Sequence, residues 1–292
     1  MKLDRREFLK IGIGTSGIAL LSPLMLSRLA MASDDKRQVS LLVDVSKCVG
    51  CWWCSLACKE CNELEGDIVC DHERPPELSP QTWTTLYTWQ DGDTWRYRRQ
   101  ACMHCTDAAC VRICPTGAVS HNEMGFVEFN QEKCSGCGYC VEHCPFTMPK
   151  LEGSRTTGIG HMNKCVFCID RVSEGQQPAC AEACPTGATK FGYRDDLLIE
   201  AEARVEELRQ TNPLANLYGV NEMGGLHVLY VLDNTPEVWG LPADPAIPPI
   251  TILHDILEWV GMVVVPVTVA AFGLNYIFSR IRIAKEAKRE RS

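Results

Sequence analysis

The chain of 292 residues has a shortage of positive charge, with 29 Lys and Arg against 37 Asp and Glu and a formal net charge of −8. The shortage is concentrated between residues 33 and 278, which carry −15, because residues 1–32 carry +3 and residues 279–292 carry +4. An acidic body excludes nucleic acid as a partner, since nucleic-acid-binding proteins need a basic face. Two basic ends are compatible with a membrane surface.

Recognisable catalytic elements are also missing. The sequence shows no Gly-rich nucleotide loop, no paired nucleophile and base, and no pterin-binding stretch. Hydrophobic residues make up 46% and charged residues 23%, which are values typical of globular proteins, and the length allows a buried core. We therefore expect a folded protein that is not an enzyme on its own.

Cysteine is absent from the last 108 residues, and all 18 cysteines lie between Cys48 and Cys184. A disulfide framework is typical of short exported domains that cannot build a core, and this chain is too long to need one. Repeated C-x-x-C spacing indicates metal binding instead.

Sixteen of these cysteines form four motifs of four. Motifs one and three have the spacing of bacterial ferredoxins, in which the first three thiolates hold one 4Fe–4S cluster and the fourth ligates its neighbour. Motifs two and four have a longer gap before the third cysteine, and a proline follows motifs two, three and four and directs the chain outward. Structural zinc, which uses pairs of cysteines, does not require this pattern. The motifs are Cys48, Cys51, Cys54 and Cys58; Cys102, Cys105, Cys110 and Cys114; Cys134, Cys137, Cys140 and Cys144; and Cys165, Cys168, Cys180 and Cys184.

The spacing thus predicts four 4Fe–4S clusters. Cys61 and Cys70 remain outside the motifs, as free thiols or as an extra disulfide. His104 lies inside motif two, where four cysteines are already present, so we expect it to tune a cluster from outside the ligand set.

The segments around the motifs repeat as well. Apolar runs at Leu41–Val43 and Phe126–Phe129 precede motifs one and three, and Thr-Gly-Ala follows motifs two and four at residues 116–118 and 186–188. These features predict an α+β fold with a duplicated two-cluster ferredoxin-like domain organised by its clusters. Removal of the iron should unfold it.

The four-cluster domain is expected over residues 39–194, with a hairpin insertion at 62–101. Two segments, Thr82–Gln90 and Thr94–Arg99, alternate apolar and polar residues around Asp91-Gly92 and predict the hairpin. Residues 195–249 are expected to be a helix, with Asp195-Asp196 near its N-cap, and then a linker, since residues 234–249 contain six prolines or glycines.

The N-terminal residues 1–32 resemble a twin-arginine export signal. Arg5-Arg6 and Phe8-Leu9-Lys10 precede an apolar run and the small-x-small sequence Ala30-Met31-Ala32. This route exports folded proteins that already hold their cofactors, so clusters could be assembled in the reducing cytoplasm. Cleavage of the signal stays open.

A single transmembrane helix is expected at residues 250–278. Trp259–Phe278 contains no Asp, Glu, Lys or Arg, and its 20 residues span roughly 30 Å as a helix, enough for one bilayer core. Pro266 would kink it, and a buried core helix is the alternative. The basic tail, residues 279–292, favours a cytoplasmic C-terminus, which places the main domain on the periplasmic side of the cytoplasmic membrane.

The motif order, with this export topology, resembles the iron–sulfur (beta) subunit of membrane-bound respiratory formate dehydrogenases over roughly residues 39–278. The likeness continues outside the motifs and narrows the match beyond a generic four-cluster subunit. It is carried by Cys48-Val49-Gly50-Cys51, Cys102-Met103-His104-Cys105, Cys134-Ser135-Gly136-Cys137-Gly138-Tyr139-Cys140, Cys144-Pro145-Phe146, Lys164-Cys165, Asp170-Arg171-Val172, Gln176 with Pro178-Ala179-Cys180, Gly224-Gly225-Leu226-His227-Val228 and Gly240-Leu241-Pro242.

The resemblance implies that motif one pairs with motif four and motif two with motif three. It implies cluster 1 on Cys48, Cys51, Cys54 and Cys184; cluster 2 on Cys165, Cys168, Cys180 and Cys58; cluster 3 on Cys102, Cys105, Cys110 and Cys144; and cluster 4 on Cys134, Cys137, Cys140 and Cys114.

As a function, the resemblance implies a non-catalytic electron-transfer subunit of anaerobic respiration. It would relay electrons from a molybdenum- or tungsten-pterin catalytic (alpha) subunit to a membrane cytochrome b (gamma) subunit and quinone. The export signal lies on the beta-like subunit itself, a departure that leaves an equivalent subunit of a membrane-bound nickel–iron hydrogenase, or of another pterin oxidoreductase, as the alternative.

Overall fold

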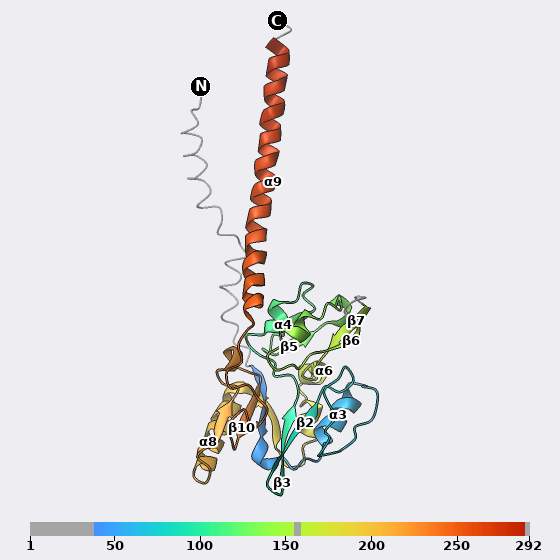
Figure 1. Ribbon diagram of the computed structural model, residues 1–292, viewed down its shortest axis with the longest axis vertical. Coiled ribbons are helices and arrows are strands. Elements are labelled where there is room, and N and C mark those ends of the chain that lie inside the picture. Colours follow the sequence, from blue (N-terminus) through green and yellow to red (C-terminus); the bar gives the residue numbers. More distant parts are fainter. Residues whose placement is uncertain (1–37, 155–158, 290–292) are drawn as a thin grey trace. The chain divides into compact units, whose positions relative to one another are not determined.

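The computed structural model describes residues 38–154 and 159–289, and the expected export signal lies outside them. In chain order the elements are β1 (Val39–Asp44), η1 (Val45–Lys47), α3 (Trp53–Cys61), β2 (Thr85–Asp91), β3 (Thr94–Gln100), α4 (Ala109–Arg112), β4 (Val119–His121), β5 (Val127–Phe129), η2 (Gln131–Lys133), α5 (Tyr139–Glu142), β6 (Lys150–Ser154), β7 (Ile159–Asn163), α6 (Ile169–Ser173), α7 (Ala179–Glu182), β8 (Thr189–Tyr193), α8 (Arg194–Arg209), β9 (Asn216–Tyr218), η3 (Glu222–Gly224), β10 (Val228–Leu232) and α9 (Pro249–Arg289) (Figure 1).

The ferredoxin-like unit occurs twice. In one copy β1 pairs antiparallel with β8, and in the other β5 pairs antiparallel with β4. The strand before each ferredoxin-spaced motif leads into a short 3-10 helix whose cap is equivalent in the two copies. Asp44 accepts a hydrogen bond from the Ser46 backbone N–H, and Asn130 accepts one from that of Lys133. The sequence repeat is therefore a structural repeat, and the α+β content is confirmed.

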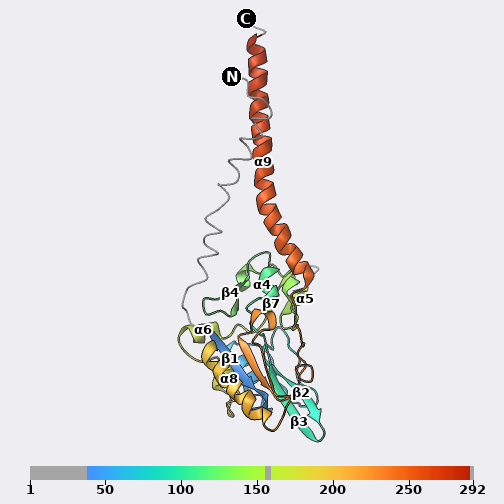
Figure 2. The same ribbon diagram turned by 90° about the vertical axis from the view of Figure 1, so that its left-hand side faces the viewer.

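A four-stranded sheet in the order β8-β1-β10-β9 extends one copy. Strand β10 pairs parallel with β1, and every residue of both strands is buried. Because side chains alternate along a strand, the two faces of the sheet enter different cores. Helix α8 covers one face, where Leu197, Ala201 and Val205 pack on Leu42 and Leu229 (Figure 2).

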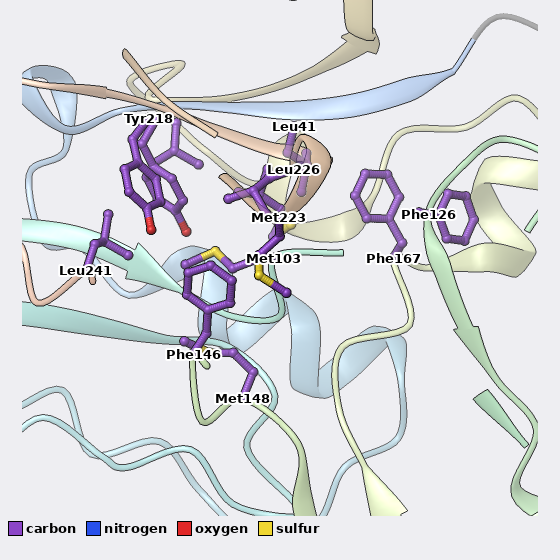
Figure 3. Packing of buried hydrophobic residues seen from close by; sticks show 14 of the residues in the cluster. Leu41, Met103, Phe126, Phe146, Met148, Phe167, Tyr218, Met223, Leu226 and Leu241 are labelled. Atoms are coloured by element: carbon purple, nitrogen blue, oxygen red, sulfur yellow. The ribbon is translucent and has the colours of Figure 1, made fainter. Parts of the chain in front are cut away.

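The other face enters the main core, which reaches the cluster motifs. Figure 3 shows Met103 and Met223 beside Leu226, with Phe146 below them. Phe126 and Phe167 stack with their ring centroids 4.7 Å apart. Met103 lies between the first two ligand candidates of motif two, so the core and the cluster loops form one packed unit.

The predicted hairpin and helix are confirmed, but the predicted helix start and the predicted linker each need a correction. Strands β2 and β3 pair antiparallel around the expected turn, and α8 covers the expected helical segment. The N-cap of α8 is Tyr193, so Asp195 and Asp196 lie in the first turn, where carboxylates suit the positive end of the helix dipole.

The second correction concerns residues 234–249, which are not simply a linker. Trp239 is fully buried in the main core and Leu241 is 3% exposed. The Tyr218 hydroxyl donates to the Pro242 carbonyl at 2.8 Å. Proline and glycine there shape a packed loop.

Helix α9 contains 41 residues, with Pro266 in its interior and apolar, exposed side chains along most of its length. Among the described residues, α9 is the one helix that is long enough and apolar enough to cross a membrane, over Pro249–Ala284. The basic tail continues the helix as far as Arg289.

Candidate iron–sulfur sites

Three of the four expected ligand sets each line a common cavity. Each set joins three cysteines of one motif to the last cysteine of another. The three cavities are lined by Cys48, Cys51, Cys54 and Cys184; by Cys58, Cys165, Cys168 and Cys180; and by Cys114, Cys134, Cys137 and Cys140.

The fourth expected set also comes together. Burial raises the pKa of Cys105 well above its ordinary value, and the next contributions come from Cys102, Cys144 and Cys110. The interaction between two charges weakens with distance, so these contributions place the four cysteines near one another. The structure thus brings all sixteen predicted cysteines together in four groups.

The cysteines suit a polynuclear centre better than a single ion. In the part of the chain that the structure describes, no three His, Cys, Asp or Glu side chains converge closely enough for one metal ion. A mononuclear zinc site would need sulfurs about 2.3 Å from one point, whereas a cubane separates its ligands. All 18 cysteines lie among the described residues, and none forms a disulfide.

Burial makes most of these thiols poor anions without a metal. It raises the pKa of Cys48 to about 11 and that of Cys54 to about 12. Iron binds the thiolate, so its positive charge would compensate the burial that now favours the protonated thiol. The donor set therefore fits a 4Fe–4S group, which supplies one-electron transfer when bound.

The last cysteines of motifs two and four have matching surroundings. Burial alone would raise the pKa of Cys184, but hydrogen bonds from the Thr189 backbone and the Thr186 side chain lower it. The same contacts, from Val119 and Thr116, lower the pKa of Cys114. The Thr-Gly-Ala segments thus place donors around the ligand that crosses between motifs.

The four groups follow one another in a line. Cys180 of the second group contributes to raising the pKa of Cys54 in the first, Cys165 of the second to that of Cys102 in the third, and Cys140 of the fourth to that of Cys110 in the third, so these pairs are neighbours. The order is therefore first, second, third and fourth.

Two buried cations accompany the cysteines, and the sequence analysis missed both. Lys164 is 2% exposed, and its Nζ donates to the Val127 carbonyl at 2.8 Å and the Cys165 carbonyl at 3.0 Å. Burial raises the pKa of Cys102 to about 11, and the charge of Lys164 acts in the opposite direction. Arg99 is equally buried. The position of Lys164 directly before Cys165 was the only sequence signal.

His104 and the two extra cysteines have different environments. His104 is fully buried and packs edge-on against Phe167, with ring centroids 4.9 Å apart, and burial lowers its pKa well below the ordinary value. Cys61 and Cys70 are free and exposed, so the disulfide alternative is wrong. Cys61 contributes to raising the pKa of Cys168, which places it beside the second group.

Comparisons with known proteins agree with an iron–sulfur protein. Residues 47–118 and residues 93–194 each match a family model described as a 4Fe-4S dicluster domain. The sequence is 38% identical over 267 residues to the formate dehydrogenase iron-sulfur subunit of Haemophilus influenzae, covering 86% of this chain and 84% of the relative. It is 41% identical over 226 residues to the nitrate-inducible formate dehydrogenase iron-sulfur subunit of Escherichia coli, covering 73% and 76%. The B subunit of the E. coli anaerobic dimethyl sulfoxide reductase is 37% identical over 166 residues, covering 55% and 76%.

Proposed function

Because this protein belongs to the family of formate dehydrogenase iron–sulfur subunits, we propose that it relays electrons through four 4Fe–4S clusters from a pterin-containing formate dehydrogenase subunit to a membrane cytochrome b and quinone. Within the enzyme complex it is an electron-transfer subunit and not the catalytic one. The observation that carries the proposal is the gathering of sixteen cysteines into four groups that join different motifs.

Each group holds one cluster, and the clusters keep the numbers given to their ligand sets. Cluster 1 takes Cys184 from motif four and cluster 2 takes Cys58 from motif one. Cluster 3 takes Cys144 from motif three and cluster 4 takes Cys114 from motif two. These crossing ligands support one domain over residues 39–194, because each pair of motifs shares two clusters.

The two ends of the cluster line have different surroundings. At cluster 1, Cys51 is exposed beside Val49 and Trp53, which are 59% and 58% exposed. Exposed apolar side chains at an exposed ligand suit a permanent protein interface. At the other end, α4 contacts both α9 and α5, and α5 carries the cluster 4 ligand Cys140. We place the catalytic subunit at cluster 1 and the cytochrome at cluster 4.

Helix α9 supports attachment to the cytoplasmic membrane. Its exposed apolar side chains would be solvated by lipid over residues 250–278, and the basic residues 279–292 would face the cytoplasm. The main domain and its extension over 195–249 then face the periplasm, after export directed by residues 1–32.

A second candidate is the equivalent subunit of another pterin oxidoreductase, favoured by the similarity to the B subunit of dimethyl sulfoxide reductase. Metal analysis of the complex purified anaerobically from membranes separates the candidates. Molybdenum or tungsten with formate-dependent quinone reduction supports the first, the same metal without formate activity supports the second, and nickel in their place supports a hydrogenase partner.

Cluster ligation is tested by Cys137→Ser, with Cys70→Ser as the control, since Cys70 is an exposed thiol outside the four groups. The parent and the control should contain about sixteen iron atoms per chain, and Cys137→Ser fewer, with slower quinone reduction. Unchanged iron and unchanged quinone reduction in Cys137→Ser would refute the ligand assignment.

A further inference from the structure

The guanidinium of Arg99 lies between the first two cluster sites. Arg99 lines the cavity of Cys48, Cys51, Cys54 and Cys184 and also the cavity of Cys58, Cys165, Cys168 and Cys180. Among the described residues it alone is common to the two linings. Its side chain is buried, with 2% of the residue exposed.

Most donors of this guanidinium have no partner in the protein. Nη2 donates to the Thr84 hydroxyl at 3.4 Å, whereas Nε and Nη1 have no acceptor among the described residues. An unpaired buried donor is destabilising, and more so when it carries charge. Acceptors are therefore expected in the two cavities that Arg99 lines.

The charge of Arg99 is also directed at these sites. Burial by itself lowers the pKa of Arg99, but Cys180, Cys165, Tyr230 and Cys54 together raise it above its ordinary value. Three of these four groups are cysteines of clusters 1 and 2. An arginine guanidinium is always protonated in proteins, so a fixed positive charge lies beside the cluster ligands.

We propose that Arg99 is a tuning residue shared by clusters 1 and 2, whose buried N–H groups donate to sulfur atoms of both clusters and whose fixed positive charge raises both reduction potentials. This inference deepens the proposed function and rests on its ligand assignment. Reduction adds one electron to a cluster, so a nearby buried cation and hydrogen bonds to sulfur stabilise the reduced form.

The tuning has a consequence for the path of electrons. The body of the chain is strongly acidic, and that charge opposes reduction of every cluster. One cation acting on two neighbouring clusters offsets the effect at both and raises both potentials in the same direction, so it does not itself separate them. An electron that passes from cluster 1 to cluster 2 then stays close to the same positive charge.

Arg98 provides a matched control on the same strand. Its side chain points to the opposite face of β3 and is also buried. Its Nε donates to the Trp239 carbonyl at 2.9 Å, and its guanidinium lies over the rings of Tyr87 and Tyr230, 5.2 and 5.4 Å from their centroids. Arg98→Gln removes the same buried charge from a site that faces tyrosines.

The test is a redox titration of the anaerobic complex, followed by electron paramagnetic resonance of the four reduced clusters. In Arg99→Gln we expect the ratio of reduced to oxidised cluster at a fixed potential to fall at least tenfold for clusters 1 and 2, which is about 59 mV for one electron. Clusters 3 and 4, and all clusters of Arg98→Gln, should change less than threefold. Arg99→Lys, which keeps the charge, should recover most of the shift.

An Arg99→Gln complex with all four ratios within threefold of the parent overturns the proposal, as does an equal shift in Arg98→Gln. The iron content and the four electron paramagnetic resonance signals of the parent complex test the ligand assignment by themselves. Failure of the Arg99 proposal can therefore be told apart from failure of the ligand assignment.

A second measurement uses the unmodified complex, so it does not depend on whether an Arg99 variant folds. Arginine labelled with ¹⁵N in its guanidino group should give a hyperfine coupling to reduced cluster 1 or 2 in the unmodified complex. Absence of that coupling at both clusters also overturns the proposal.

Discussion

A methyl group added at Gly50 provides a sharp test of how the hairpin supports cluster 1. Gly50 lies between Cys48 and Cys51 with φ of +71°, a conformation that L side chains rarely adopt. A Cβ there would lie 2.6 Å from carbon atoms of the Tyr97 ring. Since Tyr97 belongs to β3, the clash would push the cluster loop and the hairpin apart.

The expected loss in free energy of unfolding has two parts, and a comparison with a second glycine, Gly187, separates them. The left-handed conformation costs about 1–2 kcal/mol for an alanine, and overpacking against a rigid ring costs about 1–3 kcal/mol more. Gly187 lies three residues after Cys184, which belongs to the same ligand set, and has φ of +64° with nothing within 4 Å of its Cβ position. We expect Gly50→Ala to cost about 2–5 kcal/mol and Gly187→Ala only about 1–2 kcal/mol.

The free energy of unfolding would be measured by anaerobic denaturant titration followed through cluster absorbance. In a Tyr97→Ala background the ring is gone, so Gly50→Ala should cost no more than Gly187→Ala. Equal costs for the two glycine variants in the parent, or no recovery in the Tyr97→Ala background, would show that the ring contact does not limit the loop.

Three further predictions concern the whole chain. Anaerobic removal of iron by a chelator should abolish most of the far-ultraviolet circular dichroism of the main domain, because its short strands and helices are held by the ligands; retention of that signal would contradict the role of the clusters in folding. His227 is fully buried, donates from Nδ1 to the Val39 carbonyl at 2.6 Å, and has its pKa lowered by burial to about 4, so the unfolded state binds the proton first as pH falls. Stability should be full above about pH 6.5 and decline by about 3 kcal/mol as the pH falls to about 4, and His227→Gln should flatten this dependence in denaturant titrations. A truncated protein ending at Pro248 should move from the carbonate-washed membrane pellet to the soluble fraction, and a pellet that retains it would refute anchoring by α9.

Local spacing predicted the parts of the fold that are built locally. The cysteine motifs, the hairpin turn at Asp91-Gly92 and the start of α8 near Asp195-Asp196 are encoded within a few residues, so the sequence located them closely. Strand β10 was not foreseen as a partner of β1. The register pairs Leu41 with Val228, and no pattern in an apolar run of five residues says which distant strand it will join.

Residues that act through burial were the hardest to predict. The count of prolines and glycines indicated a linker at 234–249, but it could not show that Trp239 fills the core. Arg98 and Arg99 are adjacent on a strand, so their side chains point to opposite faces, and charged side chains are rarely buried. Both are buried because this end of the hairpin is covered on its two faces, which only the tertiary structure reveals.

The duplicated fold leaves differences between the cluster sites to residues other than the ligands. Cys114 and Cys184 have equivalent donors, and every proposed cluster has four cysteines, so ligation alone predicts four similar potentials. The surroundings differ: Arg99 faces the first two sites and Lys164 acts on the third. The cavity of the fourth site is lined by no Lys, Arg, Asp or Glu among the described residues. Because reduction adds negative charge, the proposed cluster without a buried cation is the one whose potential the acidic body would depress most, and its potential would then depend on the charge that the proposed membrane partner supplies.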